Sequence, residues 1–285
     1  MYSIITILSG VLLAVMVVVN GELSAQYGVF GSSVIVQVVG TLFALAMIVI
    51  KREKMVLKTT FSKWYYLSGI VTAAITVLQN AAFHYISMTS IIALGLIGQT
   101  IISLLIDQFG LFGMKKTAPS KSLIVSLIFA GIGIIVMADG TVANSVFAII
   151  LSLAAGVAIV LSRVFNAKIA EGTSILQGSF ISYFLGLPAV IFVAWLMGEM
   201  AFRPVINMSN IGLYFGGILG VGIVLICNFT TLRVSAFKLS ILIFAGQVLT
   251  GIIIDLIFNS FTMDASFWGG IIISAGILIS KLWDR

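Results

Sequence analysis

The chain has 285 residues, of which 61% are hydrophobic and only 8% are charged. Soluble domains carry about 25% charged residues, and a soluble chain this apolar would expose large hydrophobic patches to water, so the composition excludes an ordinary soluble protein. The formal net charge of +6 does not indicate a nucleic-acid partner, because no basic stretch is interleaved with aromatic residues that could stack on bases.

Ten apolar runs follow one another along the chain, each near the ~20 residues that a membrane-spanning helix needs. Backbone amides in hydrocarbon must be satisfied within the segment, and the alternating pattern of barrel strands does not occur, so the runs predict helices. The first run has neither a basic segment before it nor a cleavage site after it, so we expect a retained helix rather than a signal peptide. The expected spans are roughly 3–25, 30–50, 64–85, 88–110, 120–138, 143–165, 173–197, 208–231, 236–258 and 265–283.

The positions of the basic residues predict the orientation of these spans. Of the 15 Lys and Arg residues, 14 fall between spans on one side, and only Arg203 falls on the other. The positive-inside rule makes the crowded side cytoplasmic, so both termini are expected in the cytoplasm. In this frame Arg163 lies near the short turn between the sixth and seventh spans.

The two halves of the chain resemble each other. A displacement of 148 residues places Gly98 to Asp107 (GQTIISLLID) on Gly246 to Asp255 (GQVLTGIIID), and a displacement of 146 pairs polar residues of the first two spans with those of the sixth and seventh. Each half holds five spans, and this odd number makes the second half enter the membrane from the opposite side. The sequence therefore predicts two inverted five-helix repeats, a common plan of secondary transporters. The expected repeats are residues 1–140 and 141–285.

This plan of five plus five spans resembles the drug/metabolite transporter superfamily. The Asn-x-x-Leu ending of the first span, at Asn20, and the Gly-Gln…Ile-Asp-x-Phe-Gly segment from Gly98 to Gly110 are similar to the bacterial YdcZ-like branch. Many members of that branch are single five-span units that must pair, and this chain resembles two such units fused, although the second copy lacks the Phe-Gly after Asp255. The resemblance implies a transporter in the bacterial cytoplasmic (inner) membrane and no particular substrate.

Polar residues at equivalent positions of the two halves are the candidates for substrate binding. Gln99 and Gln247 fall at the middle of the fourth and ninth spans, where a primary amide needs partners or faces a water-filled cavity. Their side chains either form the floor of a substrate site or make hydrogen bonds between closely packed helices. Asn80 and Asn228 are a further pair, with interhelical hydrogen bonding as their alternative role. The other candidates are Gln37 and Tyr183, as a pair on the cavity wall, and Asn20 and Asn166.

Three acidic residues are candidates for binding a coupling proton or ion. Asp107 and Asp255 occupy equivalent positions at membrane depth, where carboxylates are costly and often functional. Their alternative role is structural, as helix caps or, for Asp107, as an ion pair with Lys115 or Lys116. Glu22 ends the first span and is otherwise a solvated loop residue.

Together these features favour a secondary active transporter of a small solute, such as a metabolite, an organic cation or a drug-like compound. It would work by alternating access coupled to protons or ions, since no phosphate-binding loop for ATP is present. A flippase for a lipid-linked group and an intramembrane enzyme are the alternatives. With one histidine and one cysteine, we expect no enzyme, catalytic residue, metal or cofactor. The expected partners are the solute and the lipid bilayer, with no nucleic acid, and the fusion permits a monomer without forbidding a homodimer.

Overall fold

The computed structural model consists of helices joined by short connections. No strand occurs in the residues that it describes, as the sequence predicts. The described residues are 2–56, 63–83, 85–86, 88–117, 121–137, 145–200, 211–257 and scattered positions between 268 and 279. His84 and most of the expected tenth span lie outside them.

Nine α-helices lie in the described residues. They are α1 (Tyr2–Tyr27), α2 (Val29–Ile50), α3 (Ser68–Phe83), α4 (Met88–Phe109), α5 (Lys121–Met137), α6 (Val146–Gly172), α7 (Ile175–Leu196), α8 (Gly216–Thr231) and α9 (Ala236–Ile257). Short 3-10 turns η1 (Lys63–Leu67), η2 (Leu111–Gly113) and η4 (Ile211–Phe215) adjoin α3, α4 and α8. Within the described residues, five segments are long and apolar enough to cross a membrane, namely α1, α2, α6, α7 and Ile211–Thr231.

The end of the sixth helix differs from the sequence expectation. The span was expected to end at 165, with Arg163 near the following turn, but α6 continues to Gly172, so Arg163 lies well inside the helix. A helix of 27 residues is ~40 Å long, and it therefore extends beyond a hydrocarbon core of ~30 Å. Polar residues near its end do not terminate such a helix, because the helix can continue into the interfacial region.

Three pairs of corresponding helices have the same length in the two sequence halves. α2 and α7 each have 22 residues and begin 146 residues apart. α4 and α9 also have 22 residues each and begin 148 residues apart, and α3 and α8 have 16 residues each at the same displacement of 148. These displacements are the ones that align the polar residues of the sequence.

The chain divides into two compact units, and each unit takes segments from both sequence halves. The helices α1, α3 and α6 contribute residues to both units. The compact units are therefore a different division of the chain from the expected repeats. Unit 1 holds residues 1–11, 78–160 and 233–285, and unit 2 holds residues 12–77 and 161–232.

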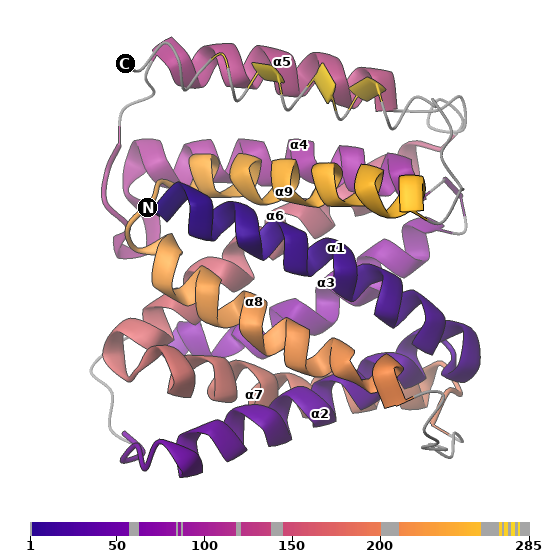
Figure 1. Cartoon of the computed structure of the whole chain (residues 1–285), viewed down its shortest axis with the longest axis vertical. Coiled ribbons are helices and arrows are strands. Elements are labelled where there is room, and N and C mark those ends of the chain that lie inside the picture. Colours follow the sequence, from indigo (N-terminus) through magenta and orange to yellow (C-terminus); the bar gives the residue numbers. More distant parts are fainter. Residues whose placement is uncertain are drawn as a thin grey trace. The chain divides into compact units, whose positions relative to one another are not determined.

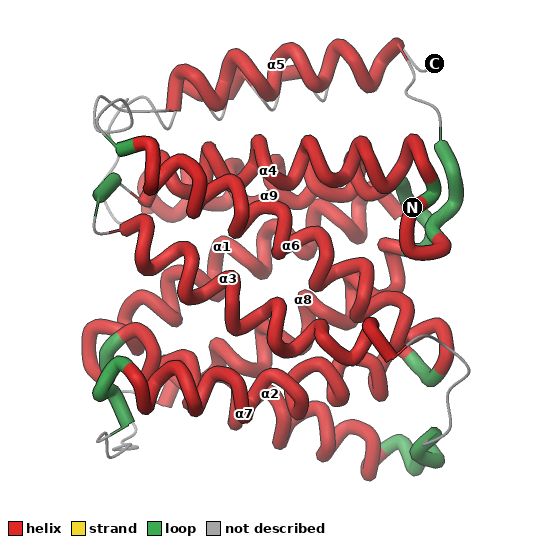
Figure 2. The backbone as a smooth tube through the Cα atoms, turned by 180° about the vertical axis from the view of Figure 1, so that it is seen from behind, coloured by secondary structure: helices red, strands yellow, loops and turns green. Residues whose placement is uncertain are grey.

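Unit 2 is built around α2 and α7, which lie side by side (Figures 1 and 2). Val34 of α2 and Val190 and Ala194 of α7 form one buried apolar cluster. The ring of Tyr183 lies directly over Gly40, where a β-carbon would overlap it. α8 packs on the same pair, because Gly217 approaches the backbone of α2.

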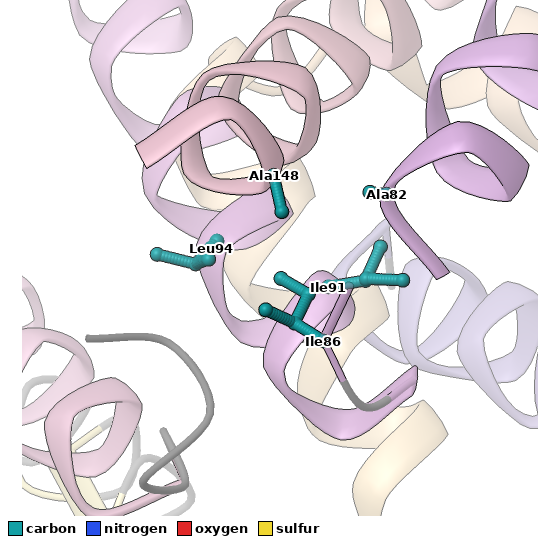
Figure 3. Packing of buried hydrophobic residues seen from close by; sticks show 5 residues of the cluster. All are labelled: Ala82, Ile86, Ile91, Leu94 and Ala148. Atoms are coloured by element: carbon teal, nitrogen blue, oxygen red, sulfur yellow. The ribbon is translucent and has the colours of Figure 1, made fainter. Parts of the chain in front are cut away.

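Unit 1 is built around α4 and α9, which also lie side by side (Figures 1 and 2). At one end of α4, Ile91 and Leu94 pack with Ala82, Ile86 and Ala148 in a buried apolar cluster (Figure 3). Small residues allow the backbones in this unit to approach closely, which is the usual way that helices associate in lipid.

Candidate functional site

The two midspan glutamines lie in unit 1, each at a close helix crossing. A β-carbon at Gly156 of α6 would lie 2.9 Å from the backbone nitrogen of Gln99 on α4, and a β-carbon at Gly10 of α1 would lie 2.9 Å from that of Gln247 on α9. Gly10 and Gly156 are 146 residues apart, so the two crossings are equivalent in the two halves. Both glutamine side chains are half-buried. The backbones of the two glutamines therefore lie at matching helix crossings.

Gln37 and Tyr183, paired by displacement in the sequence, are in contact in unit 2. Nε2 of Gln37 donates a hydrogen bond of 2.8 Å to the backbone carbonyl of Tyr183. Both residues are buried, and the tyrosine hydroxyl lies against Gly220 of α8. The contact links α2 to α7 through one side chain and one main-chain group, which fits interhelical hydrogen bonding.

Three predicted asparagines of unit 2 share one feature. The Oδ1 atoms of Asn20, Asn166 and Asn228 are buried and have no hydrogen-bond partner within the described part of the chain. The amide nitrogen of Asn228 donates to Oγ of Ser179 at 3.2 Å and to the carbonyl of Ile175 at 3.4 Å. Most buried polar atoms of folded proteins are paired, so these acceptors can receive a donor from water or a solute.

Asp107 accepts hydrogen bonds from the first turn of another helix. Its Oδ1 accepts from the backbone nitrogen of Ala236 at 2.8 Å, and its Oδ2 accepts from that of Phe237 at 3.0 Å. Both donors belong to α9, whose first amides have no partner inside the helix. Asp107 is buried and forms no ion pair with Lys115 or Lys116, all three being described residues. Asp107 of α4 therefore caps the start of the neighbouring helix α9.

The sequence reasoning missed two acidic residues that play the same part in unit 2. Oε2 of Glu199, which follows α7, accepts from the backbone nitrogens of Phe30 at 2.6 Å and Gly31 at 3.0 Å in the first turn of α2. Oε2 of Glu53, which follows α2, accepts from the hydroxyl of Ser174, the N-cap of α7, at 2.7 Å. Glu53 and Glu199 are 146 residues apart, and this displacement was the signal that could have identified them.

Of the two coupling candidates whose side chains the structure describes, Glu22 is exposed and Asp107 is buried. Glu22 lies five residues before the end of α1 rather than at its end. Its counterpart at a displacement of 146 is Lys168, which pairs with Glu171 at 2.7 Å. The side chains of Asp255 and Asn80 lie outside the described part of the structure.

Comparisons with known proteins place this arrangement in a family. The sequence profile of the family described as "Putative inner membrane exporter, YdcZ" matches residues 1–136 and 147–279. A crystal structure titled "Crystal structure of protein" has a TM-score of 0.74 and 14% identity, with 100% of this chain and 99% of that chain covered, and it shows the fold alone. No curated protein matches the sequence.

The family description and the apolar helices indicate a multi-pass protein of the inner membrane and a role in transport. The profile covers both sequence halves, which hold all the candidate residues. The chain belongs to the YdcZ family of drug/metabolite transporters.

Proposed function

We propose that the chain is a secondary active transporter that exports a small solute across the bacterial inner membrane by alternating access. The observation that carries the proposal is that the exporter-family profile matches two segments, one in each half of the chain. A duplicated exporter unit is what an alternating-access carrier requires, since two similar halves can exchange inward-open and outward-open arrangements.

The proposed architecture is ten transmembrane helices in two inverted five-helix repeats, 1–140 and 141–285. Equal helix lengths at displacements of 146 and 148 support it, and so do the equivalent crossings at Gly10 and Gly156. With the basic residues facing the cytoplasm, both termini are cytoplasmic. One chain carries both halves, so a monomer is the proposed functional unit.

The proposed substrate contacts are amides and one tyrosine that repeat between the halves. In unit 1 they are Gln99, Gln247 and Asn80, and in unit 2 they are Asn20, Asn166, Asn228, Gln37 and Tyr183. The unpaired acceptors of the three described asparagines favour a solute that brings hydrogen-bond donors. An organic cation with N–H groups and a hydroxylated metabolite both have this chemistry.

The coupling residue is proposed to be Glu22 or Asp255. The side chain of Glu22 is exposed, whereas both oxygens of Asp107 accept hydrogen bonds from the backbone amides of α9. Protonation of Asp107 would remove the negative charge that strengthens its two bonds to the start of α9, so we propose a structural role for it.

Transport by purified protein in proteoliposomes tests the function. The assay follows ethidium, as an organic cation, and a panel of ¹⁴C-labelled amino acids and sugars, with and without a proton gradient. We expect at least one compound to move and the double variant Gln99→Leu and Gln247→Leu to stop it without lowering the protein yield. Gln108→Leu is the matched control, because Gln108 is an exposed glutamine on the same helix as Gln99. Normal transport by the double variant would show that Gln99 and Gln247 are not part of the substrate site.

A further inference from the structure

The helices α2 and α7 are tied together at both ends by carboxylates. Each helix is followed, three residues after its last residue, by a glutamate. Glu199 binds the first turn of α2, and Glu53 binds Ser174, the N-cap residue of α7. We propose that Glu53 and Glu199 act as a reciprocal pair of latches that make α2 and α7 one rigid arm throughout transport. This proposal rests on the transport function proposed above.

The attraction at each latch has a clear physical origin. The first amides of a helix have no partner within the helix and carry the positive end of the helix dipole, so they favour a negative group. Hydrogen bonds to a carboxylate are also stronger than those between neutral groups. The protein uses the glutamates of two different helices to supply this charge, which joins the helices as well as capping them.

The latch at the start of α2 is direct. The residue before α2 is Gly28, which has no side chain to cap the helix and a φ of 75°. The carboxylate of Glu199 occupies the space where a side chain at Gly28 would lie. It therefore serves as the cap that the local sequence omits.

At the start of α7, Glu53 acts through the hydroxyl of Ser174, and further hydrogen bonds join the same two segments. Ser174 already caps α7 by accepting from the backbone nitrogen of Gln177 at 3.1 Å, and it donates its hydroxyl to Glu53. The side chain of Gln177 adds bonds of 2.9 Å each to the carbonyl of Lys54 and the nitrogen of Val56, in the segment that follows α2. This end retains several ties if Glu53 is removed.

Both latches are closed in the same structure, as expected for ties that hold one body together. α2 has 22 residues, so the latches lie at the two ends of a helix that is ~33 Å long, enough to span the membrane. Alternating access opens one membrane face while the other is closed. Gates at the two faces would not both be closed in an open state, whereas ties that hold one body together stay closed in every state.

Contacts midway along α2 and α7 also indicate that the two helices form one rigid body. Gln37 bonds to the backbone of Tyr183, and the tyrosine ring fills the space over Gly40. Sliding α2 along α7 by one turn would break this bond and drive the ring into neighbouring side chains. The largest motions during transport are therefore expected outside the α2–α7 arm.

Cross-linking of α2 to α7 tests the arm directly. In a Cys227→Ser background, which removes the one cysteine of the chain, Val34→Cys and Val190→Cys are joined by a short bis-methanethiosulfonate reagent. We expect the cross-linked protein to export the compound found above at a rate within about twofold of the reduced protein, because a tie that is always closed adds no new barrier. Loss of export on cross-linking, restored by a reductant, would overturn the proposal.

Thermal unfolding of three glutamate variants in detergent is the second measurement. We expect Glu199→Gln to lower the midpoint most, Glu53→Gln to lower it less, and the exposed Glu171→Gln to leave it nearly unchanged. If Glu199→Gln has no larger effect than Glu171→Gln, the latch is not a tie and the proposal fails. If the reduced protein moves no compound of the panel, the proposed transport function fails, and the unfolding midpoints still decide whether the latches hold α2 and α7 together.

Discussion

The carboxylate of Asp107 and the backbone nitrogen of Ala236 are joined by a hydrogen bond of 2.8 Å, although the two residues are 129 positions apart in the chain. This bond and its neighbour from Phe237 begin α9 with a cap that comes from α4. Asp107 therefore has a structural role. Its substitution should change the stability of the protein but not the coupling of transport to a proton gradient.

Asp107→Ala should lower the free energy of unfolding by about 1–2 kcal/mol, because the first amides of α9 lose their partner. Asp107→Asn should cost less, since the amide oxygen still accepts one bond. Chemical unfolding in detergent measures both changes. In proteoliposomes, Asp107→Asn should keep the dependence of transport on a proton gradient. A normally stable Asp107→Asn protein without that dependence would instead identify Asp107 as the coupling residue.

Gly156→Ala and Gly10→Ala should each destabilise the protein by about 1–3 kcal/mol, the range for overpacking of a close contact. A β-carbon at Gly156 meets the carbonyl of Gly95, and one at Gly10 meets that of Ile243, so neither neighbour can move as a flexible side chain would. Gly131→Ala is the control, because no described atom lies within 4 Å of the added carbon. If Gly131→Ala lowered the unfolding midpoint as much as the other two variants, the close helix crossings at Gly10 and Gly156 would be contradicted.

Asn166→Leu should raise KM by about tenfold, the effect of losing ~1.4 kcal/mol of binding, and leave stability unchanged or increased. Its Oδ1 has no partner within the described residues, and replacing an unsatisfied polar group by an apolar one is not costly. Asn228→Leu is the comparison, because it also loses the bond to Ser179 and should lower stability. Transport kinetics and unfolding are both measured. A less stable Asn166→Leu with unchanged KM would make Asn166 a structural residue.

Glu22→Gln should abolish accumulation driven by a proton gradient while leaving exchange down a solute gradient, because the amide cannot release a proton. Transport with and without an imposed pH gradient measures the difference. Glu171→Gln is the control, since Glu171 is an exposed acid that pairs with Lys168. Gradient-driven accumulation by Glu22→Gln at the original level would leave Asp255 as the remaining candidate.

Single cysteines at Lys54 and Lys116 in the Cys227→Ser background should react with an impermeant maleimide from the same side of the membrane. This follows from the proposed orientation, in which the segments after α2 and after α4 are both cytoplasmic. A cysteine at Arg203 should react from the opposite side. Labelling of Lys54→Cys and Lys116→Cys from different sides would overturn the two inverted repeats and the carrier mechanism with them.

The sequence anticipated the helices well where hydropathy changes sharply at both ends. The expected spans 88–110 and 236–258 agree with α4 and α9 to within one residue. The end of α6 was placed too early, because a polar residue such as Arg163 marks the edge of the hydrocarbon and not the end of the helix. The pairing of Gln37 with Tyr183 was read from the displacement of the halves, but the bond goes to the tyrosine backbone, which a comparison of side chains does not reveal.

By itself, the amino-acid sequence determined that the chain is helical, apolar and internally repeated, because hydropathy and repeated spacing are properties of the linear chain. Only the tertiary structure decided what its acidic residues do. Asp107, Glu53 and Glu199 each bind the start of a helix that is more than 100 residues away in the chain. The open amides of a helix start attract any carboxylate that packing brings within reach, and packing in three dimensions determines which carboxylate that is.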